Sequence, residues 1–378
     1  MSFARDLIKK VVIHASKYLP VSKRVMLFDN FRGKGFGDDP RYILEELHGR
    51  NPGYRFYWVS DGKEDSLPDY VKPVRYDSPL YFFISARAAV WVSNAKGSWK
   101  PYKKKGQFYL QTWHSTLGLK RNEEEAPMLG EDYINAAKRD ASLTDLMYSD
   151  NDFRFDKYKN HYWYDGEVIK CDVPRIGAMM NRKEEFTSKV RAQYGIPAED
   201  RIMVYMPTFR KERKTDVYVF DYEKLLDALK NRFGTEFIPV GKLHPSMTDK
   251  KFVSIPKDAV DATQHTDPNE LLAAADVLIT DYSASFFDFI LLGKPVFLIG
   301  VDRDEYMKSD RGLAFSLDEL PVEIALNEDE LALQIAAFDE TEYLAKCEAF
   351  RKKVGYVDGG NGASVLADRI EAFLNGKN

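Results

Sequence analysis

Hydrophobic residues occur along the chain in two alternating patterns: short continuous runs, and longer segments with the period of a helix. The first series of short runs predicts strands at residues 25–28, 54–59, 71–76, 89–93, 107–113 and 146–149. The second series predicts strands at residues 202–205, 237–240, 277–279 and 296–299. Helix-length segments separate these runs, including residues 80–88, 183–194, 222–233 and 286–292. Strands that alternate with helices are typical of parallel sheets built from βαβ units.

The alternation restarts near residues 171–181, and 378 residues are enough for two hydrophobic cores. We therefore expect an N-terminal helix at residues 1–22, a first α/β domain at 23–172 and a second α/β domain at 173–378 that ends in helices. The predicted fold class is α/β, with two doubly wound parallel sheets facing each other across a cleft. In such sheets ligands bind at the carboxyl ends of the strands.

Residues 2–19 have apolar positions at helical spacing, and the opposite face is basic, with Arg5, Lys9, Lys10 and Lys17. A basic amphipathic helix is typical of proteins that lie on an anionic membrane surface. The same apolar stripe also suits a helix packed on the protein's own core. The pattern leaves both possibilities open.

Composition excludes several classes of protein. The net charge of −4 argues against binding nucleic acid through bulk charge. The chain has two cysteines, Cys171 and Cys347, which form neither a metal motif nor a disulfide framework, so a reducing cytosolic setting is expected. No run of about 18 apolar residues predicts a membrane-spanning helix, and the N-terminus lacks the apolar core of a signal peptide.

Polar and titratable residues follow several predicted strands. In the first half, His114 and Lys120 follow the strand at 107–113; an imidazole there could take a proton from a hydroxyl nucleophile. The candidates in the second half are Arg210, Lys242, His244, Thr280, Asp281, Ser283 and Ser285. Cations and a helix N-terminus suit a diphosphate. No metal site or cofactor is predicted, so charged side chains and helix dipoles of the protein would stabilise the charge on such a ligand.

Each of these features also has a purely structural interpretation. His114 would serve equally as a buried structural histidine, and Asp281 or Ser283 as the cap of the helix that follows. The glycine-rich loop at residues 29–40 matches neither a P-loop nor a dinucleotide fingerprint, so it is either an acceptor-binding loop or a mobile one.

Four motifs in order carry a resemblance to a known family. They are Trp113-His114 with Lys120, Met206-Pro207-Thr208-Phe209-Arg210, Lys242-Leu243-His244-Pro245 and Thr280-Asp281-Tyr282-Ser283. Together they resemble the CDP-glycerol glycerophosphotransferase family, which builds teichoic acids and related polyol-phosphate polymers of bacterial envelopes. The resemblance covers roughly residues 25–299 and implies a GT-B architecture.

The resemblance also implies roles. His114 corresponds to the catalytic base that deprotonates the acceptor hydroxyl, and CMP leaves from a CDP-polyol donor. His244 is the second catalytic candidate. Together with Arg210 it would bind the donor's diphosphate and neutralise its charge. Asp281 and Ser283 belong to the donor-binding segment, where Lys242, Thr280, Ser285 and Lys120 are further substrate-binding candidates. The acceptor would be a lipid-linked saccharide, and the protein would be peripheral on the cytoplasmic face of the membrane.

One departure from the family's pattern affects Lys120. The family usually has a proline after the His and Thr, whereas this chain has Leu117-Gly118-Leu119 before Lys120, so the lysine comes one residue later. Rival hypotheses are a CDP-ribitol transferase, a nucleotide-sugar glycosyltransferase of the same architecture, and a non-catalytic membrane-surface scaffold. The sequence does not indicate the oligomeric state.

Overall fold

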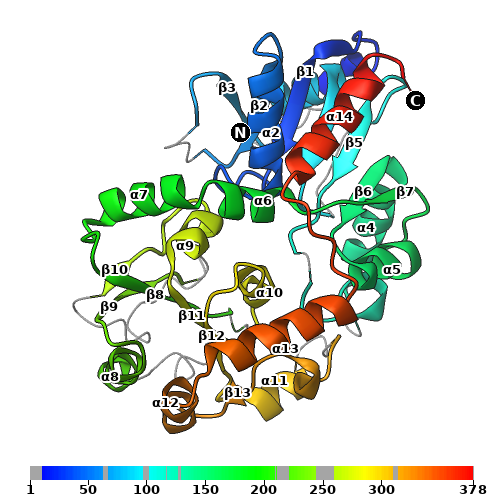
Figure 1. Cartoon of the computed structure of the whole chain (residues 1–378). Coiled ribbons are helices and arrows are strands. Elements are labelled where there is room, and N and C mark those ends of the chain that lie inside the picture. The colour runs from blue at the N-terminus through cyan, green and yellow to red at the C-terminus, as the bar shows by residue number, and fades with distance from the viewer. Residues whose placement is uncertain are drawn as a thin grey trace, which may run out of the picture. The chain divides into compact units, whose positions relative to one another are not determined.

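The computed structural model describes residues 11–62, 67–96, 102–115, 117–126, 129–208, 210, 221–243, 259–309 and 314–377 (Figure 1). The chain divides into two compact units. Unit 1 consists of Met1–His114, Leu129–Gly177 and Val357–Asn378, and unit 2 of Ser115–Met128 and Ala178–Tyr356. Each unit is built on one parallel sheet.

Unit 1 contains a sheet with the order β3-β2-β1-β4-β5-β6-β7, seven strands in the described part of the chain. Their bounds are β1 Ser22–Asp29, β2 Arg55–Ser60, β3 Val71–Arg75, β4 Ala88–Ser93, β5 Phe108–Gln111, β6 Leu146–Ser149 and β7 Glu167–Lys170. The helices are α2 Asp38–Arg50, α3 Pro79–Arg87, α4 Glu131–Leu143, α5 Asp152–His161 and α14 Gly362–Leu374. Every residue of β4 is buried, as expected for a central parallel strand covered on both faces.

Unit 2 contains a sheet with the order β10-β9-β8-β11-β12-β13, six strands among the described residues. They are β8 Arg201–Met206, β9 Phe237–Gly241, β10 Val260–Asp261, β11 Val277–Thr280, β12 Val296–Ile299 and β13 Ile324–Ala325. The helices are α7 Lys183–Tyr194, α8 Tyr222–Phe233, α9 Pro268–Ala274, α10 Ser285–Ile290, α11 Arg303–Ser309, α12 Glu328–Ala336 and α13 Glu340–Lys353. Short 3₁₀ turns lie at Glu123–Glu125 and Leu317–Glu319, and α6, Pro174–Asn181, carries the chain from unit 1 into unit 2.

The two sheets share one topology. In unit 1 the chain builds outward from β1 through β2 to β3, then restarts with β4 on the other side of β1. In unit 2 it builds from β8 through β9 to β10, then restarts with β11 beside β8. The connections therefore diverge at the β1/β4 and β8/β11 pairs, and the carboxyl ends of such pairs are where doubly wound sheets bind ligands.

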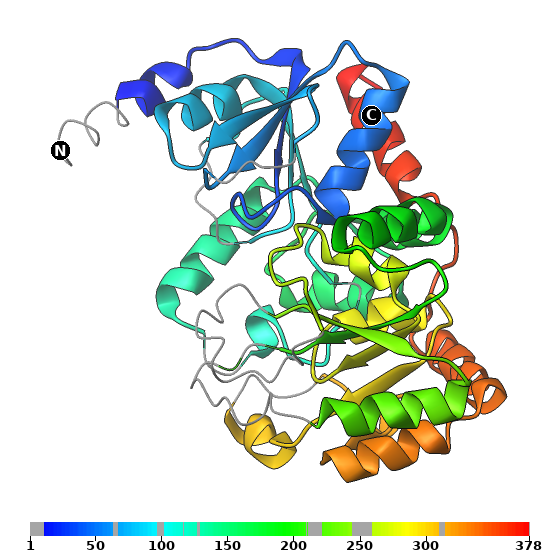
Figure 2. The same cartoon turned by 90° about the vertical axis from the view of Figure 1, so that its left-hand side faces the viewer.

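The units are not the contiguous halves expected from the sequence. Helix α14 returns to unit 1 and packs on α2, where Arg50 bonds Asp368 and Glu371, and the blue and red helices lie side by side in Figure 2. The segment after His114 belongs to unit 2, because Leu119 is buried there and its carbonyl accepts the Ala314 amide at 2.7 Å. Hydrophobic spacing along the chain predicts elements but not the sheet to which a segment returns.

The N-terminal segment is described from Val11, and residues 11–16 are helical. Val12 and Ile13 pack against the hydrophobic cluster of β1, β4 and α3, which supports core packing for that face. The Lys104 ammonium holds the end of the segment by donating to the Leu19 carbonyl at 2.6 Å. Tyr18 remains exposed. Among the described residues, no helix is both long and apolar enough to cross a membrane.

Candidate active site

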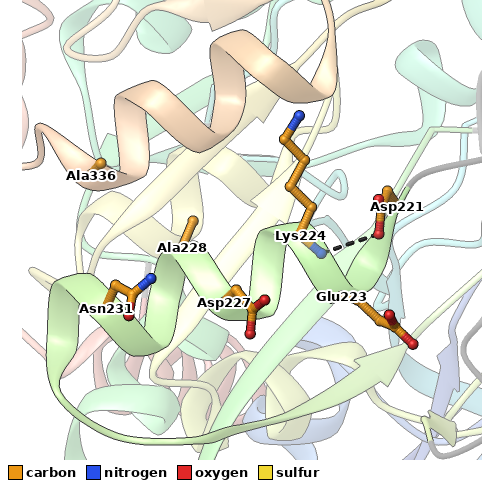
Figure 3. A pocket seen from close by; sticks show the side chains of 7 residues that line it. All are labelled: Asp221, Glu223, Lys224, Asp227, Ala228, Asn231 and Ala336. Carbon is orange, nitrogen blue, oxygen red and sulfur yellow. Dashed lines mark hydrogen bonds between the residues drawn. The ribbon is translucent and has the colours of Figure 1, made fainter.

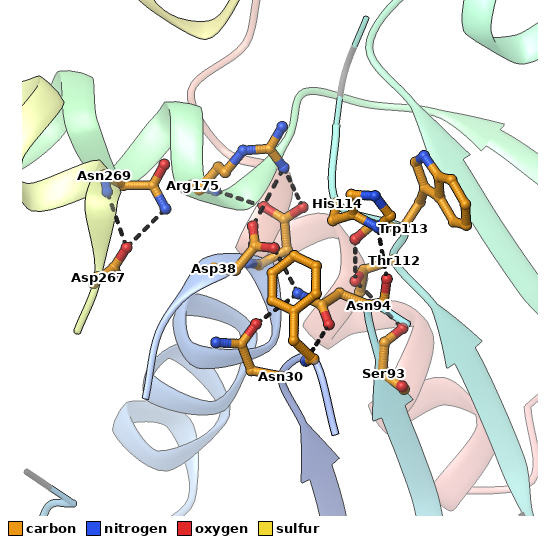
Figure 4. Close-up of polar contacts among 12 residues, drawn as sticks. Asn30, Asp38, Ser93, Asn94, Thr112, Trp113, His114, Arg175, Asp267 and Asn269 are labelled. Atoms are coloured by element: carbon orange, nitrogen blue, oxygen red, sulfur yellow. Dashed lines mark hydrogen bonds and ion pairs between the residues drawn. The ribbon is translucent and has the colours of Figure 1, made fainter. Parts of the chain in front are cut away.

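Each unit has a polar cluster at the carboxyl ends of its central strands. In unit 1, Asn30 directly follows β1 and Asn94 directly follows β4. The Asn94 amide nitrogen donates to Asn30 Oδ1 and to Asp38 Oδ2, both at 2.6 Å, and Asn94 Oδ1 accepts the Phe31 amide at 2.8 Å (Figure 4). All three residues joined through Asn94 lie in the loop at 29–40 or at the start of α2, so this loop is fastened to the end of the sheet.

His114 lies three residues beyond the end of β5. Its Nδ1 is 3.1 Å from the backbone carbonyl oxygen of Asn94. A carbonyl oxygen only accepts hydrogen bonds, so this contact favours the proton on Nδ1, which makes Nε2 the basic nitrogen of the neutral ring. The ring is exposed and lies between two aromatic rings, with centroids 4.3 Å from Trp113 and 5.2 Å from Phe31. His114 is therefore an oriented surface imidazole, not the buried structural histidine that was the alternative.

The backbone around His114 is strained. Trp113, Phe31, Arg32 and Asp38 have φ between 44° and 61°, in the left-handed region, and they are four of the seven non-glycine residues in that region within the described chain. Each such residue costs about 1–3 kcal/mol and persists only where its surroundings hold it, as often happens at functional sites. Gly33 has φ +93°, and a Cβ there would lie 2.5 Å from the Ser60 carbonyl carbon, so this position requires glycine.

A buried ion pair between Arg175 and Asp39 holds the end of this loop in place. Arg175 Nη1 lies 2.6 Å from Asp39 Oδ2, and the Arg175 amide donates to Asp39 Oδ1 at 2.9 Å. Burial raises the pKa of Asp39, and the charge of Arg175 opposes that rise. The pair fixes the first turn of α2, whose Asp38 accepts from Asn94.

In unit 2, Arg210 joins three strand ends. Its Nε and Nη2 donate to the two carboxylate oxygens of Asp302 at 2.7 and 3.1 Å, and its Nη1 lies 2.9 Å from Asp281 Oδ2. Arg210 follows β8, Asp281 follows β11 and Asp302 follows β12. Burial lowers the pKa of Arg210, but the bonds to Asp302 and the charge of Asp281 raise it further, so the guanidinium stays charged.

Aromatic rings complete the Arg210 cluster. Tyr282 and Tyr306 stack with their centroids 3.9 Å apart, and the Arg210 guanidinium lies 4.8 Å from the Tyr306 centroid. The predicted site residue Lys120 places its ammonium 5.0 Å from the same Tyr306 ring. Cations over tyrosine faces are attracted by the ring quadrupole. The structure thus brings Lys120, Arg210 and Asp281 into one cluster.

Two predicted site residues point into the protein. The Lys242 ammonium donates to the carbonyls of Thr263 and His265 at 2.8 and 2.9 Å, and burial lowers its pKa to about 8. Thr280 is fully buried, and its hydroxyl donates to the Met206 carbonyl at 2.6 Å. Both residues lie at the predicted strand ends, but their polar atoms hold neighbouring backbone.

The structure does not confirm the alternative that Asp281 or Ser283 caps helix α10. The cap position is Ala284, with no side-chain cap, and Asp281 instead accepts the Thr208 amide at 2.8 Å. The half-buried hydroxyls of Ser283 and Ser285 lie 2.7 Å apart, and Ser283 also accepts the Ser285 amide at 3.3 Å. Predicted residue His244 lies outside the described residues.

Sequence reasoning missed Asn30, Asn94, Asp38, Arg175 and Asp302. Asn30 and Asn94 immediately follow strands and Asp302 follows β12 closely, so the rule that ligands bind at strand ends would have included them. The asparagines were overlooked because they do not titrate. Asp38 and Arg175 are far apart in the chain and meet only in the folded protein, so no local sequence pattern predicts either as a site residue.

A shallow surface depression of about 520 Å³ lies elsewhere, along α8 and beside Ala336 of α12 (Figure 3). Its lining includes Asp227 and Asn231, and none of the predicted site residues. Over the described residues, no group of three or more His, Cys, Asp or Glu side chains is arranged to hold a metal ion.

Two doubly wound parallel sheets with polar clusters at their diverging strands define the GT-B-like class, which confirms the predicted fold class. The chain belongs to the CDP-Glycerol:Poly(glycerophosphate) glycerophosphotransferase family, whose model matches residues 11–372. The family resemblance seen in the four motifs is thereby confirmed.

Named relatives agree with this family. The chain is 28% identical over 366 residues to a teichoic acid poly(glycerol phosphate) polymerase of Staphylococcus epidermidis, covering 93% of this chain and 51% of that protein. It is 25% identical to a teichoic acid glycerol-phosphate transferase of Staphylococcus aureus, covering 97% and 99%. The structure of the wall teichoic acid polymerase TagF, with CDPG, superimposes with a TM-score of 0.85 at 26% identity over 99% of this chain and 94% of that one. The chain spans about half the length of the polymerases of S. epidermidis and Bacillus subtilis.

Proposed function

We propose that this protein transfers glycerol phosphate from CDP-glycerol to a hydroxyl of a lipid-linked or growing poly(glycerol phosphate) acceptor, releasing CMP, in teichoic acid synthesis. The observation that carries the proposal is His114, whose Nδ1 is bound by the Asn94 carbonyl so that Nε2 is the basic nitrogen. Family membership and the names of the relatives supply the substrate class.

In the proposed reaction, His114 Nε2 takes the proton of the acceptor hydroxyl. The acceptor oxygen forms a bond to the phosphorus that carries glycerol. The bond from that phosphorus to the oxygen bridging to CMP breaks, and CMP leaves with the electron pair. General-base catalysis of this kind contributes about 10²–10⁴-fold.

Unit 2 would bind the donor at the β8/β11 strand ends. We assign direct donor contacts to Ser283, Ser285, Lys120 and His244. Ser283, Ser285 and Lys120 are only half-buried, which supports this assignment. Arg210, Asp281, Thr280 and Lys242 instead hold the strand ends in position, because their polar atoms bond protein groups. This revises the predicted diphosphate role of Arg210.

The lipid-linked acceptor implies an anionic membrane surface, and unit 1 offers a fitting patch. Exposed apolar side chains on residues 11–19, α3 and the segment after residue 101 are Val11, Tyr18, Leu80, Phe83 and Tyr102. Cations accompany them, with the Lys17 ammonium 4.4 Å from the Tyr102 ring and the Arg87 guanidinium 5.7 Å from the Phe83 ring. Aromatic and basic groups together suit a headgroup region. We propose peripheral attachment to the cytoplasmic face through this patch.

Liposome flotation tests the attachment. The double variant Tyr18→Ser/Phe83→Ser should lose binding to vesicles containing anionic phospholipid, while the wild type loses it at high salt. The matched control is Leu333→Ser, an exposed apolar residue of α12 in unit 2. Equal binding by the double variant and the wild type would refute the patch.

A donor panel tests the function itself. The protein is incubated with a synthetic lipid-linked disaccharide and CDP-glycerol, CDP-ribitol or UDP-sugars, and the product mass is measured. The proposal expects the mass of glycerol phosphate to be added, with release of CMP. CDP-ribitol is included because a relative is named as a teichoic acid poly(ribitol-phosphate) polymerase. Product formed only from a nucleotide sugar would overturn the proposal.

A further inference from the structure

We propose that Asn94 is a positioning residue for the catalytic base: its side chain fixes its own backbone carbonyl, and that carbonyl sets the tautomer of His114. The catalytic consequence rests on the proposed function, whereas the tautomer is a property of the folded chain alone. Asn94 makes both contacts: its backbone carbonyl oxygen contacts the His114 ring, and its side-chain amide anchors the loop through Asn30.

The amide of Asn94 is fully used in this arrangement. Its nitrogen supplies one hydrogen to Asn30 and one to Asp38, and its oxygen accepts the Phe31 amide. An aspartate has no hydrogens to donate, and a leucine has neither donor nor acceptor. Asparagine is therefore the side chain whose donors and acceptor match all three neighbours at this length.

The neighbours of Asn94 are themselves held in place. Asp38 Oδ1 accepts the Asp39 amide at 2.9 Å and lies 3.5 Å from Arg175 Nη1. Asn30 donates through its own nitrogen to the carbonyls of Lys34 and Gly35, which leaves its oxygen to face Asn94. The network thus fixes the backbone immediately after β4, and the Asn94 carbonyl cannot turn away without breaking these bonds.

The carbonyl direction decides which imidazole nitrogen is basic. A neutral histidine in water is protonated mainly at Nε2, and in that form Nε2 cannot take a proton from the acceptor. The Asn94 carbonyl favours the opposite tautomer by accepting from Nδ1. A displaced carbonyl would let the ring return to its solution tautomer.

The test compares four proteins: the wild type, Asn94→Asp, the double variant Asn94→Asp/Asp38→Asn, and Asn231→Asp as a surface control. Asn94→Asp places a carboxylate against Asp38 and removes both donors. The double variant reverses donor and acceptor between positions 94 and 38. We expect kcat for CMP release to fall about 10–100-fold in Asn94→Asp with KM for CDP-glycerol unchanged. The double variant should recover part of this loss, and the surface control should match the wild type.

The direct readout is ¹⁵N-histidine NMR above the pKa of the imidazole, with the His114 signals assigned by their loss in His114→Ala. The wild type should show a protonated Nδ1, and Asn94→Asp should shift His114 toward protonated Nε2. If Asn94→Asp does not fold, Asn94→Ser removes the same bonds without adding charge. An unchanged tautomer in a folded variant would overturn the inference. A wild type that releases no CMP from CDP-glycerol would refute the proposed function but leave this NMR test intact.

Discussion

The β1/β4 ends of unit 1 and the β8/β11 ends of unit 2 occupy equivalent places in the same topology, yet different chemistry holds them together. In unit 1 two neutral side chains, Asn30 and Asn94, meet at the diverging strands. In unit 2 a guanidinium, Arg210, lies between the carboxylates of Asp281 and Asp302. One topology therefore supplies two places for a site, and the side chains decide what each place does.

The difference fits the two halves of the proposed reaction. A base needs a fixed orientation, which the Asn94 carbonyl gives His114 through a hydrogen bond. A donor site must instead hold several strand ends in place beside a charged diphosphate. Buried ion pairs suit this task, because breaking one is strongly destabilising. We therefore expect charge-removing substitutions to reduce stability in unit 2, and Asn94 substitutions to affect orientation in unit 1.

Arg210→Met should produce the largest loss of stability. It leaves the carboxylates of Asp281 and Asp302 buried together without their cation, which should lower the free energy of unfolding by about 3–5 kcal/mol. Arg182→Met is the matched control, because Arg182 makes the same two-pronged contact with Glu185 on the surface. That exposed pair should contribute no more than about 1 kcal/mol. Equal losses in urea unfolding would show that charge does not hold unit 2 together.

Lys242→Met should change the pH dependence of stability. Burial lowers the pKa of Lys242 from 10.5 to about 8, so above pH 8 the folded chain loses this proton while the unfolded chain keeps it up to 10.5. Between these pH values the unfolded state binds more protons than the folded state. The free energy of unfolding of the wild type therefore rises with pH through this range.

The difference in unfolding free energy between the wild type and Lys242→Met should thus grow by about 2 kcal/mol from pH 7 to pH 10 in the wild type's favour. Urea unfolding at both pH values measures it. Lys189→Met, at a half-exposed ammonium of α7, is the control. A difference that stays constant with pH would mean that the Lys242 ammonium is not buried as described.

Tyr282→Phe should have the smallest effect. Its hydroxyl is buried and has no hydrogen-bond partner among the described residues, so removing it should leave stability unchanged or raise it by up to about 1 kcal/mol. Tyr343→Phe in the same unit removes a hydroxyl that donates to the Lys294 carbonyl at 2.6 Å, and should lower stability by about 1 kcal/mol. Thermal unfolding distinguishes the two, and a loss for Tyr282→Phe as large as for Tyr343→Phe would contradict the assignment.

The sequence located the strand ends well because apolar runs are a local property. The predicted strand at 277–279 became β11, and Asp281 lies just beyond it, at the diverging strands. The directions of side chains were not predictable in the same way. Lys242 lies where expected, but its ammonium turns to carbonyls more than twenty residues away in the chain. Such pairings depend on tertiary contacts, which no local pattern encodes.

Long-range partners were missed for the same reason. Arg175 and Asp39 are separated by most of unit 1 in sequence, and neither belongs to a motif. The return of α14 to α2 is similar, because the two helices are far apart in the chain: the bonded residues Arg50 and Asp368 are 318 positions apart. The hydrophobic pattern placed His114 just after a strand, but only the structure gives the Asn94 carbonyl as its partner.

The most direct test of the central claim separates donor binding from proton transfer in His114→Ala, with His161→Ala on α5 as the control. Calorimetry measures Kd for CDP-glycerol, and single-turnover assays with acceptor measure CMP release. We predict an unchanged Kd with release slowed by about 10²–10⁴-fold in His114→Ala, and no change in the control. CMP release from His114→Ala at the wild-type rate would contradict the account.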